Sequence, residues 1–199
     1  MTHTQYYHSP LGSILIAADE IGLTGLWFHG QKYSADTLPQ EHIQKETATL
    51  AGVKRWLDIY FSGREPDFLP SLHPLGTPFR RAVWELLLQI PYGRTVTYGE
   101  LARRLAAKQG LVHMSAQAVG GAVGHNPISI LIPCHRVVGS GGSLTGYAGG
   151  IDKKSVCWSW KERIWPVCSC PNPAPPFHIQ TLLLLSLEPE TPWYTPGNS

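Results

Sequence analysis

The sequence predicts an α/β protein in which a small antiparallel sheet and one helix precede a helical region. Between Gln5 and Phe28, runs of β-branched and aromatic residues alternate with short turn sequences, which is typical of a β-meander. From Thr47 onward, hydrophobic residues recur every three or four positions, and capping residues precede several of these runs. Of the 199 residues, 43% are hydrophobic and 15% are charged, so the chain can bury a core and is not disordered throughout.

The N-terminal region is expected to contain strands at Ile14–Ala18 and Leu23–Phe28, separated by turns that contain Gly12 and Gly22. A helix over 47–61 should follow and stop at the Ser-Gly pair after it. Its buried face would consist of Leu50, Val53, Trp56, Leu57 and Tyr60. A connector rich in Pro and Leu then leads to the helical region.

Three further helices are expected, each with a capping residue at its start. Thr77 stands before Pro78, a residue favoured at the first helical position. Thr97 caps Tyr98–Ala106 with a glutamate at the third position, and Ser115 caps a helix that ends near Val123. The last two helices are short and joined by a turn, which favours helix-turn-helix geometry.

The apolar run 128–138 is expected to be a β-strand that Pro133 interrupts. Beyond Lys154 the composition changes to Trp- and Pro-rich sequence without periodicity. We therefore expect three segments: 1–75 as an α/β domain with its connector, 76–154 as a helical domain, and 155–199 as a poorly structured tail. The first ten residues lack the apolar core of a secretory signal, and no run is long enough to span a membrane.

Cys134 is the candidate nucleophile. A thiol reacts as thiolate and needs a proton acceptor nearby, and His135 follows it directly. Neighbours on a strand point to opposite faces, so His135 can assist Cys134 only if the chain bends, which Pro133 favours. The other cysteines are Cys157, Cys168 and Cys170. No disulfide framework emerges from this distribution, and reduced intracellular thiols are the simpler interpretation.

Two motifs stand out in the chain, NPISILIPCHRVVG at 126–139 and GYAGG at 146–150. In these motifs the chain resembles the methylated-DNA–protein-cysteine methyltransferases, also called O6-alkylguanine-DNA alkyltransferases. VTYGELA and AVGGAV match upstream, and the resemblance extends over Tyr7–Lys154. It implies a small ribonuclease-H-like N-terminal domain followed by a helical, winged helix-turn-helix-like catalytic domain. It also implies irreversible transfer of an alkyl group to Cys134 from a flipped O6-alkylguanine, with O4-alkylthymine as a further substrate.

The resemblance also implies the partners and site residues. The partner is double-stranded DNA, contacted in the minor groove by a cytoplasmic monomer that has no cofactor, metal or membrane attachment. Tyr98 would donate to the base, His135 would deprotonate the thiol through a water, and Asn126 would order the turn. The base pocket would include Arg136, Val137, Tyr147 and Ala148. The DNA contacts would be Gln117, Ala118, Gly121, Arg80, Arg81, Arg103 and Arg104.

The net charge of +2 does not by itself indicate DNA binding. The segment 79–113 carries six Lys or Arg residues against only Glu85 and Glu100, although a solvated helix face gives the same pattern. Gln117 stands where the family usually has an arginine that fills the space left by the flipped nucleotide. The turn at Ala107–His113 also looks longer than usual.

The tail departs further from the family. A glutamate that accepts from the active-site histidine is expected fourteen residues after Tyr147, but Lys161 stands there and Glu162 comes one position late. When 155–165 is translated back with plausible codons and read in a shifted frame, a Leu-Leu-Glu sequence emerges. A one-base deletion in the adenine tract that encodes Lys153-Lys154 would explain this. A genuine lineage-specific tail is the alternative.

Three other interpretations compete with alkyl transfer. An alkylated-DNA-binding protein with impaired transfer is the nearest alternative, because both Gln117 and the missing glutamate would weaken repair. A cysteine hydrolase is disfavoured, since no oxyanion-hole glycine motif accompanies Cys134. A metal site is disfavoured because its candidate ligands lack a recognised spacing. Those ligands would be Cys157, Cys168, Cys170 and His178.

Overall fold

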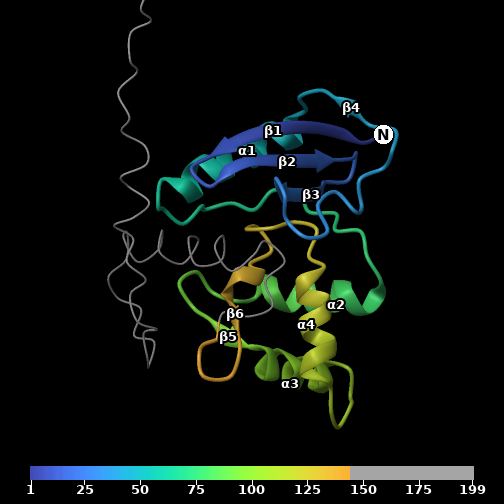
Figure 1. Ribbon diagram of the computed structural model, residues 1–199, viewed down its shortest axis with the longest axis vertical. Coiled ribbons are helices and arrows are strands. Elements are labelled where there is room, and N and C mark those ends of the chain that lie inside the picture. The colour runs from blue at the N-terminus through green and yellow to red at the C-terminus, as the bar shows by residue number, and fades with distance from the viewer. Residues whose placement is uncertain (144–199) are drawn as a thin grey trace, which may run out of the picture. The chain divides into compact units, whose positions relative to one another are not determined.

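Residues 1–143, which the computed structural model describes, form two successive parts with one shared hydrophobic core (Figure 1). The first part contains a four-stranded sheet and one helix, and the second contains three α-helices and a short parallel strand pair. Ile14 and Phe28 of the first part belong to the same buried cluster as Val83 and Val119 of the second. Within these residues the α/β expectation is confirmed.

The sheet is the antiparallel meander that the sequence predicted, with one added strand. β1 (His3–Ser9), β2 (Gly12–Ala18) and β3 (Leu23–Phe28) pair in order along the chain. β4 (Ile43–Gln44) pairs in parallel with β1, so the spatial order is β3-β2-β1-β4. β4 was not predicted, because two exposed residues carry no recognisable pattern. β3 is therefore an edge strand, and its outer side faces the second part of the chain.

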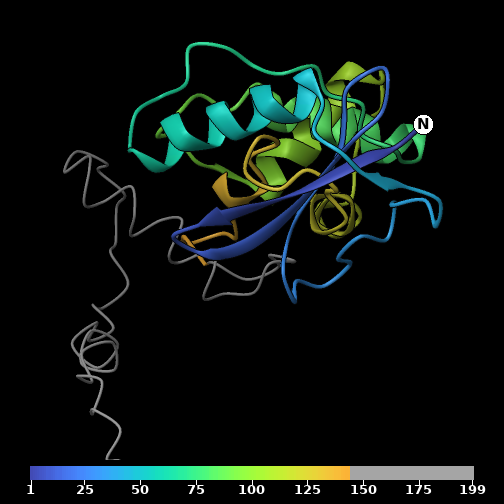
Figure 2. The same ribbon diagram turned by 90° about the horizontal axis from the view of Figure 1, so that it is seen from above.

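Helix α1 (Ala48–Phe61) packs against β1, β2 and β3 (Figure 2). It begins where predicted, because the side chain of Thr47 accepts a hydrogen bond from the backbone N–H of Leu50 at 3.3 Å. It stops at Ser62, and Gly63 follows with φ 84°, a conformation that suits glycine. All five residues expected on its buried face are buried.

The second part contains three helices that pack against one another: α2 (Pro78–Leu88), α3 (Tyr98–Lys108) and α4 (Ala116–Gly124). Thr77, Thr97 and Ser115 cap them as predicted, each accepting from the backbone N–H three residues later. The indole Nε1 of Trp84 donates to the carbonyl of Ala122 at 2.9 Å and ties α2 to α4. The α3–α4 pair has the predicted helix-turn-helix order.

The apolar run 128–138 does not form the expected strand. Only its last two residues form a strand, β6 (Val137–Val138), which pairs in parallel with β5 (Val96–Thr97). A 3-10 helix, η1 (Cys134–Arg136), precedes β6. The expectation of a strand interrupted at one proline was therefore wrong for most of the run.

The physical reason is that burial, not strand pairing, explains the apolar composition of this run. Ile128 makes a single bridge to β3, Ile130 has φ 70°, and the N–H of Ile132 donates back to Ile128. Pro133 has no N–H to offer to a ladder. The buried side chain of Asn126 takes the place of a neighbouring strand by bonding these backbone groups.

Candidate active site

Cys134 is the first residue of η1 and is only 4% exposed. The side-chain amide of Asn126 donates to its Sγ with an Nδ2–Sγ distance of 3.1 Å. The backbone N–H of Cys134 donates to the carbonyl of Ile132 at 2.7 Å, which fixes the residue from the other direction. A hydrogen-bond donor at sulfur stabilises the thiolate relative to the thiol. The arrangement therefore holds one thiol in a fixed position and favours its reactive form.

Asn126 shapes the turn that carries this cysteine. Its Oδ1 accepts from the N–H of Ile128 at 3.0 Å. Its Nδ2 lies 3.2 Å from the carbonyl oxygen of Ile128 and 2.9 Å from that of Ile132, in addition to the thiol. Because Asn126 is buried, each of these groups would be costly to leave without a partner. One side chain thus determines both the backbone path and the environment of Cys134.

His135 is completely buried, and its Nε2 lies 3.4 Å from the hydroxyl oxygen of Tyr60 in α1. The two rings meet edge to face at 76°, with centroids 6.5 Å apart. The turn of η1 supplies the change of direction after Cys134 that a straight strand would lack. The sequence assigned Tyr60 only to a buried helix face. Only one clue to its contact with His135 was present in the sequence: the hydroxyl of a buried tyrosine usually has a hydrogen-bond partner.

Tyr98 begins α3 close to Cys134, because the β5–β6 pair places Thr97 opposite Val138. Its ring lies beside Gly120 of α4, where an added Cβ would stand 3.7 Å away. Burial, and secondarily the neighbouring Cys134, raise the pKa of Tyr98 to about 12. The phenol is therefore protonated at neutral pH and can donate a hydrogen bond to a group that becomes negative.

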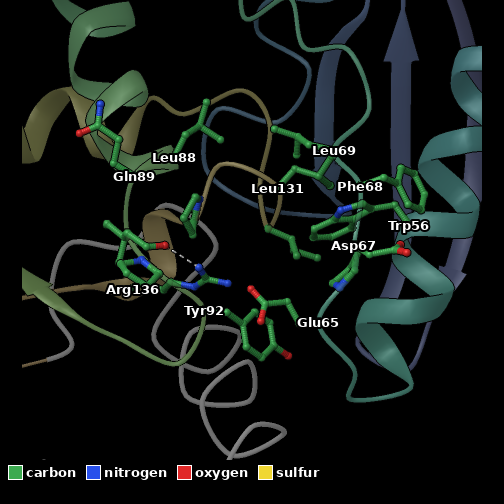
Figure 3. Close-up of a pocket in the computed structure, with 15 residues that line it drawn as sticks. Trp56, Glu65, Asp67, Phe68, Leu69, Leu88, Gln89, Tyr92, Leu131 and Arg136 are labelled. Atoms are coloured by element: carbon green, nitrogen blue, oxygen red, sulfur yellow. Dashed lines mark hydrogen bonds between the residues drawn. The ribbon is translucent and has the colours of Figure 1, made fainter.

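Arg136 extends its guanidinium into a neighbouring hollow of about 390 Å³ (Figure 3). Its Nη1 donates to the carbonyl of Ile90 at 2.9 Å, and its guanidinium carbon lies 5.1 Å from the centre of the Tyr92 ring. Burial lowers the pKa of Arg136, although Glu65, which lines the same hollow, favours its charged form. Cys134 is absent from the described lining. Arg136 therefore braces this segment beside the thiol.

The expected DNA-contacting residues of α4 are exposed: Gln117, Ala118 and Gly121. Their short or uncharged side chains permit close approach of a second surface. On α3, Arg104 pairs with Glu100 at 2.5 Å, whereas Arg103 is exposed beside it. The expected arginines of α2 are Arg80, which is half-buried, and Arg81, which is exposed. The cations lie on the two helices that pack against α4.

The turn between α3 and α4 is long and protrudes beyond both helices (Figure 1). Gly110 adopts φ 66° and allows the N–H of Leu111 to bond back to Ala106 at 2.9 Å. Leu111 is half exposed and Val112 fully exposed. The turn therefore presents an apolar tip beside the start of α4.

Comparison with known proteins agrees with this geometry. A family model described as the ribonuclease-like domain of 6-O-methylguanine DNA methyltransferase matches residues 2–72, and the corresponding DNA binding domain matches 78–161. A methylated-DNA–protein-cysteine methyltransferase of Haemophilus influenzae is 42% identical over 151 residues, covering 75% of this chain and 80% of the relative. The chain belongs to this family. Its relative from Methanosarcina barkeri is 44% identical over 159 residues, covering 78% and 94% of the two chains.

Solved structures of family members share the fold. Mycobacterium tuberculosis OGT, solved in complex with DNA, superposes with a TM-score of 0.69 at 38% identity, covering 81% of this chain and 94% of that one. The Methanococcus jannaschii O6-methylguanine DNA methyltransferase gives 0.56 at 26% identity, covering 85% and 99%. The predicted fold class, a ribonuclease-like domain followed by a DNA-binding domain, is confirmed.

Other expected family positions have the following places in the chain. Val137 is buried in β6. Several expected positions lie outside the described residues: Tyr147, Ala148, the glutamate position and the tail at 155–199. The cysteines of the disfavoured metal site also lie outside them. Within residues 1–143 no three His, Cys, Asp or Glu side chains cluster as metal ligands would. Every helix in that part is too short or too polar to cross a bilayer.

Proposed function

We propose that this protein repairs DNA by moving an alkyl group from O6 of guanine to the Sγ of Cys134. The observation that carries the proposal is the buried thiol held 3.1 Å from the amide of Asn126, in a chain of the methyltransferase family. A thiolate is a strong nucleophile, and the amide donor favours that form. O4-alkylthymine is a second proposed substrate, since it carries the same kind of alkyl–oxygen bond.

In the proposed step the sulfur of Cys134 attacks the alkyl carbon, so an S–C bond forms as the bond from that carbon to O6 breaks. The electron pair of the broken bond stays on guanine, and Tyr98 donates a hydrogen bond to the base as its charge develops. His135 accepts the thiol proton through a water, and the contact with Tyr60 fixes its ring. The thioether has no good leaving group, so each molecule reacts once.

The target guanine must leave the double helix to reach a buried thiol. We propose that α4 lies at the minor groove and that Gln117 occupies the space left by the flipped nucleotide. The arginines would contact phosphates, which gives affinity without sequence preference. They are Arg80, Arg81, Arg103 and Arg104. The main chain at Val137, with Tyr147 and Ala148, would form the base pocket, and Arg136 would support it through Ile90.

We propose a monomer as the active form, because Asn126 and Cys134 meet within one segment of the chain and Tyr98 lies beside them. The reaction requires Cys134 as a reduced thiol, which supports a cytoplasmic location. We also propose that a shifted reading frame removed the glutamate that would accept from His135. The nucleotide sequence across codons 152–156 tests this directly. If independent isolates carry the same adenine tract and encode the same tail, the tail is genuine and the proposed deletion is rejected.

The experiment compares the wild-type chain with Cys134→Ser on a duplex that contains one methyl-labelled O6-methylguanine. We expect wild type to acquire the label on the peptide that contains residue 134. Cys134→Ser should bind the same duplex with unchanged affinity and acquire none, because α4 is left intact. Binding without transfer by wild type would instead support the alternative, a DNA-binding protein with impaired repair. Label on another residue would overturn the proposed role of Cys134.

A further inference from the structure

The first part of the chain holds the segment that carries Asn126. The N–H of Leu26 in β3 donates to the carbonyl of Pro127 at 2.8 Å, and the N–H of Ser129 donates to the carbonyl of Leu26 at 3.0 Å. These bonds use the outer edge of β3, which would otherwise present unpaired backbone groups. The turn at 125–129 is therefore docked on the N-terminal sheet as well as on α4.

The loop that follows β3, residues 29–38, makes a second connection to this turn. The buried Oε1 of Gln31 accepts from the N–H of Phe28 at 2.9 Å and from the hydroxyl of Ser129 at 3.3 Å. Gln31 thus joins the end of β3 to a residue three positions after Asn126. A buried amide that bonds both sides of a junction fixes their separation.

A third connection lies on the other side of Asn126. The ring of Tyr33 stacks on His125 with centroids 4.1 Å apart and an angle of 22°. His125 in turn donates from Nδ1 to the carbonyl of Gly121 in α4 at 2.7 Å. The ammonium of Lys32 lies 4.8 Å from the centre of the same tyrosine ring. Tyr33 of the loop therefore packs against His125, the residue immediately before Asn126, and His125 connects the loop to α4.

This loop adopts an unfavourable backbone conformation to make these contacts. Tyr33 has φ 60° and Ala35 has φ 59°, the left-handed region that residues with a Cβ rarely enter. Of the three non-glycine residues with positive φ among residues 1–143, two are in this loop and the third is Ile130 in the site segment. Such conformations persist only where surrounding contacts hold them.

We propose that Gln31 and Tyr33 are positioning residues for Cys134, acting through Asn126. They fix the two ends of the turn and so keep the Asn126 amide at hydrogen-bond distance from the thiol. A displacement of a fraction of an ångström would weaken that bond, because hydrogen bonds lose strength steeply with distance and angle. The N-terminal domain then sets the reactivity of a nucleophile that lies in the second domain. This rests on the proposed function only in taking Cys134 as the reacting residue.

The test uses Tyr33→Asn, because asparagine removes the ring but tolerates a left-handed backbone. Its matched control is Tyr33→Phe, which retains the stack. In each full-length chain, the rate of Cys134 modification by iodoacetamide is followed across a series of pH values from the mass of the peptide that contains it. The other titratable groups of the site are unchanged in all variants: Tyr98 near the thiol, His135 next to it in the chain, and Tyr60, which contacts His135.

We expect Tyr33→Asn to move the midpoint of this pH profile upward and to slow the reaction at neutral pH about tenfold, as a one-unit shift would. Tyr33→Phe should match wild type. Ser129→Ala, which breaks only the link to Gln31, should shift the midpoint in the same direction by less. Affinity for undamaged duplex should be unchanged in all three variants.

An unchanged pH midpoint in Tyr33→Asn, with or without a lower melting temperature, would overturn the proposal and leave the loop a purely structural role. The same result follows if Tyr33→Phe loses as much reactivity as Tyr33→Asn. Because iodoacetamide reports on the thiol alone, the proposal can stand even if wild type takes no methyl group from DNA. That outcome would reject the proposed function instead.

Discussion

The tetrapeptide Ser-Ile-Leu-Ile occurs twice in this chain, at 13–16 and at 129–132, with different conformations. The first copy lies in β2 and pairs with β1 on one side and β3 on the other. The second copy lies between α4 and η1, where Ile130 has φ 70° and the N–H of Leu131 bonds to the carbonyl of Ser129. Both isoleucines are buried in both copies.

The difference shows that burial and backbone pairing are separate requirements. An apolar, β-branched sequence satisfies the first in either place, but the second depends on which groups the fold brings alongside. In β2 those groups are neighbouring strands. In the second copy they are the amide of Asn126 and the edge of β3, and Pro133 prevents a longer ladder. The unusual path is what places Cys134 against a side-chain donor.

Replacing the organising amide should have the largest effect. Asn126→Ala leaves the N–H of Ile128 without a partner in the interior, at a cost of about 1–3 kcal/mol. It also removes the amide's hydrogen bonds to the thiol and to the carbonyl of Ile132, which keeps the N–H of Cys134 as a donor. At about 1 kcal/mol for each lost bond, we expect about 4 kcal/mol lower stability in total. Asn126→Asp, the matched control, retains the acceptor but loses both N–H donors. The second carboxylate oxygen would face two carbonyl oxygens and the thiol in the interior, so denaturant unfolding at neutral pH should rank this variant no higher than the alanine variant. A loss below about 1 kcal/mol for Asn126→Ala would mean that the turn forms without this residue.

A substitution in the copy of the tetrapeptide in β2 should lower the stability of the protein without changing the reactivity of Cys134. Ile16→Ala deletes a fully buried side chain, and such truncations cost about 2–5 kcal/mol. Folded molecules of this variant should modify Cys134 at the wild-type rate, since the thiol is held by the side chain of Asn126 and its backbone N–H by the carbonyl of Ile132. The two properties are measured by denaturant unfolding and by peptide mass after reaction. A slower thiol with unchanged stability would contradict the separation between the two regions.

Gln117→Arg, at the proposed DNA interface, should change the rate of transfer from duplex DNA but not the intrinsic reactivity of the Cys134 thiol. An arginine can hold the space left by a flipped nucleotide, and unstacking costs a few kcal/mol, so we expect transfer from duplex DNA to rise by about threefold or more. Transfer from O6-alkylguanine as a free base needs no unstacking and should not change. Equal gains on both substrates would show that residue 117 does not act in flipping.

The smallest expected effect is at the turn between β2 and β3. Burial alone would raise the pKa of Asp19, but hydrogen bonds from the N–H of Gly22, from His73 at 2.6 Å and from the N–H of Ile21 outweigh it, so the pKa is lowered. The carboxylate therefore stabilises the fold above the ordinary Asp pKa, and this contribution is lost as pH falls through the lowered value.

Asp19→Asn should accordingly cost at most about 1 kcal/mol at neutral pH, because the pair is partly exposed to solvent. The difference in stability between Asp19→Asn and wild type should disappear in acid, where Asp19 is protonated in both the folded and the unfolded protein. Melting temperatures recorded over a pH series measure it. A deficit that persists unchanged into acid would assign the effect to packing rather than to charge.

Local features of the fold could be predicted from the sequence, whereas contacts between distant segments could not. The helix starts at Thr47, Thr77, Thr97 and Ser115 were correct because a cap acts on a backbone N–H three residues away. The strand over 128–138 was wrong because its conformation depends on the edge of β3, about a hundred residues earlier.

The candidate site divides in the same way. Cys134, His135, Asn126 and Tyr98 could be predicted as site residues because they lie in motifs that resemble the family. Tyr60 and Tyr33 were missed because each touches the site region through a long-range contact that leaves no spacing signal. Such contacts become visible only when the two parts of the chain are packed together.

The central claim is that Cys134, held by Asn126, accepts one alkyl group and is not regenerated. It is tested most directly by titrating the protein against an excess of duplex that carries O6-methylguanine, then counting lesions removed per protein and weighing the peptide that contains residue 134. The account predicts one lesion removed per molecule and the mass of one methyl group added to that peptide. Removal of several lesions per molecule, or a methylated protein whose Cys134 peptide has its original mass, would contradict it.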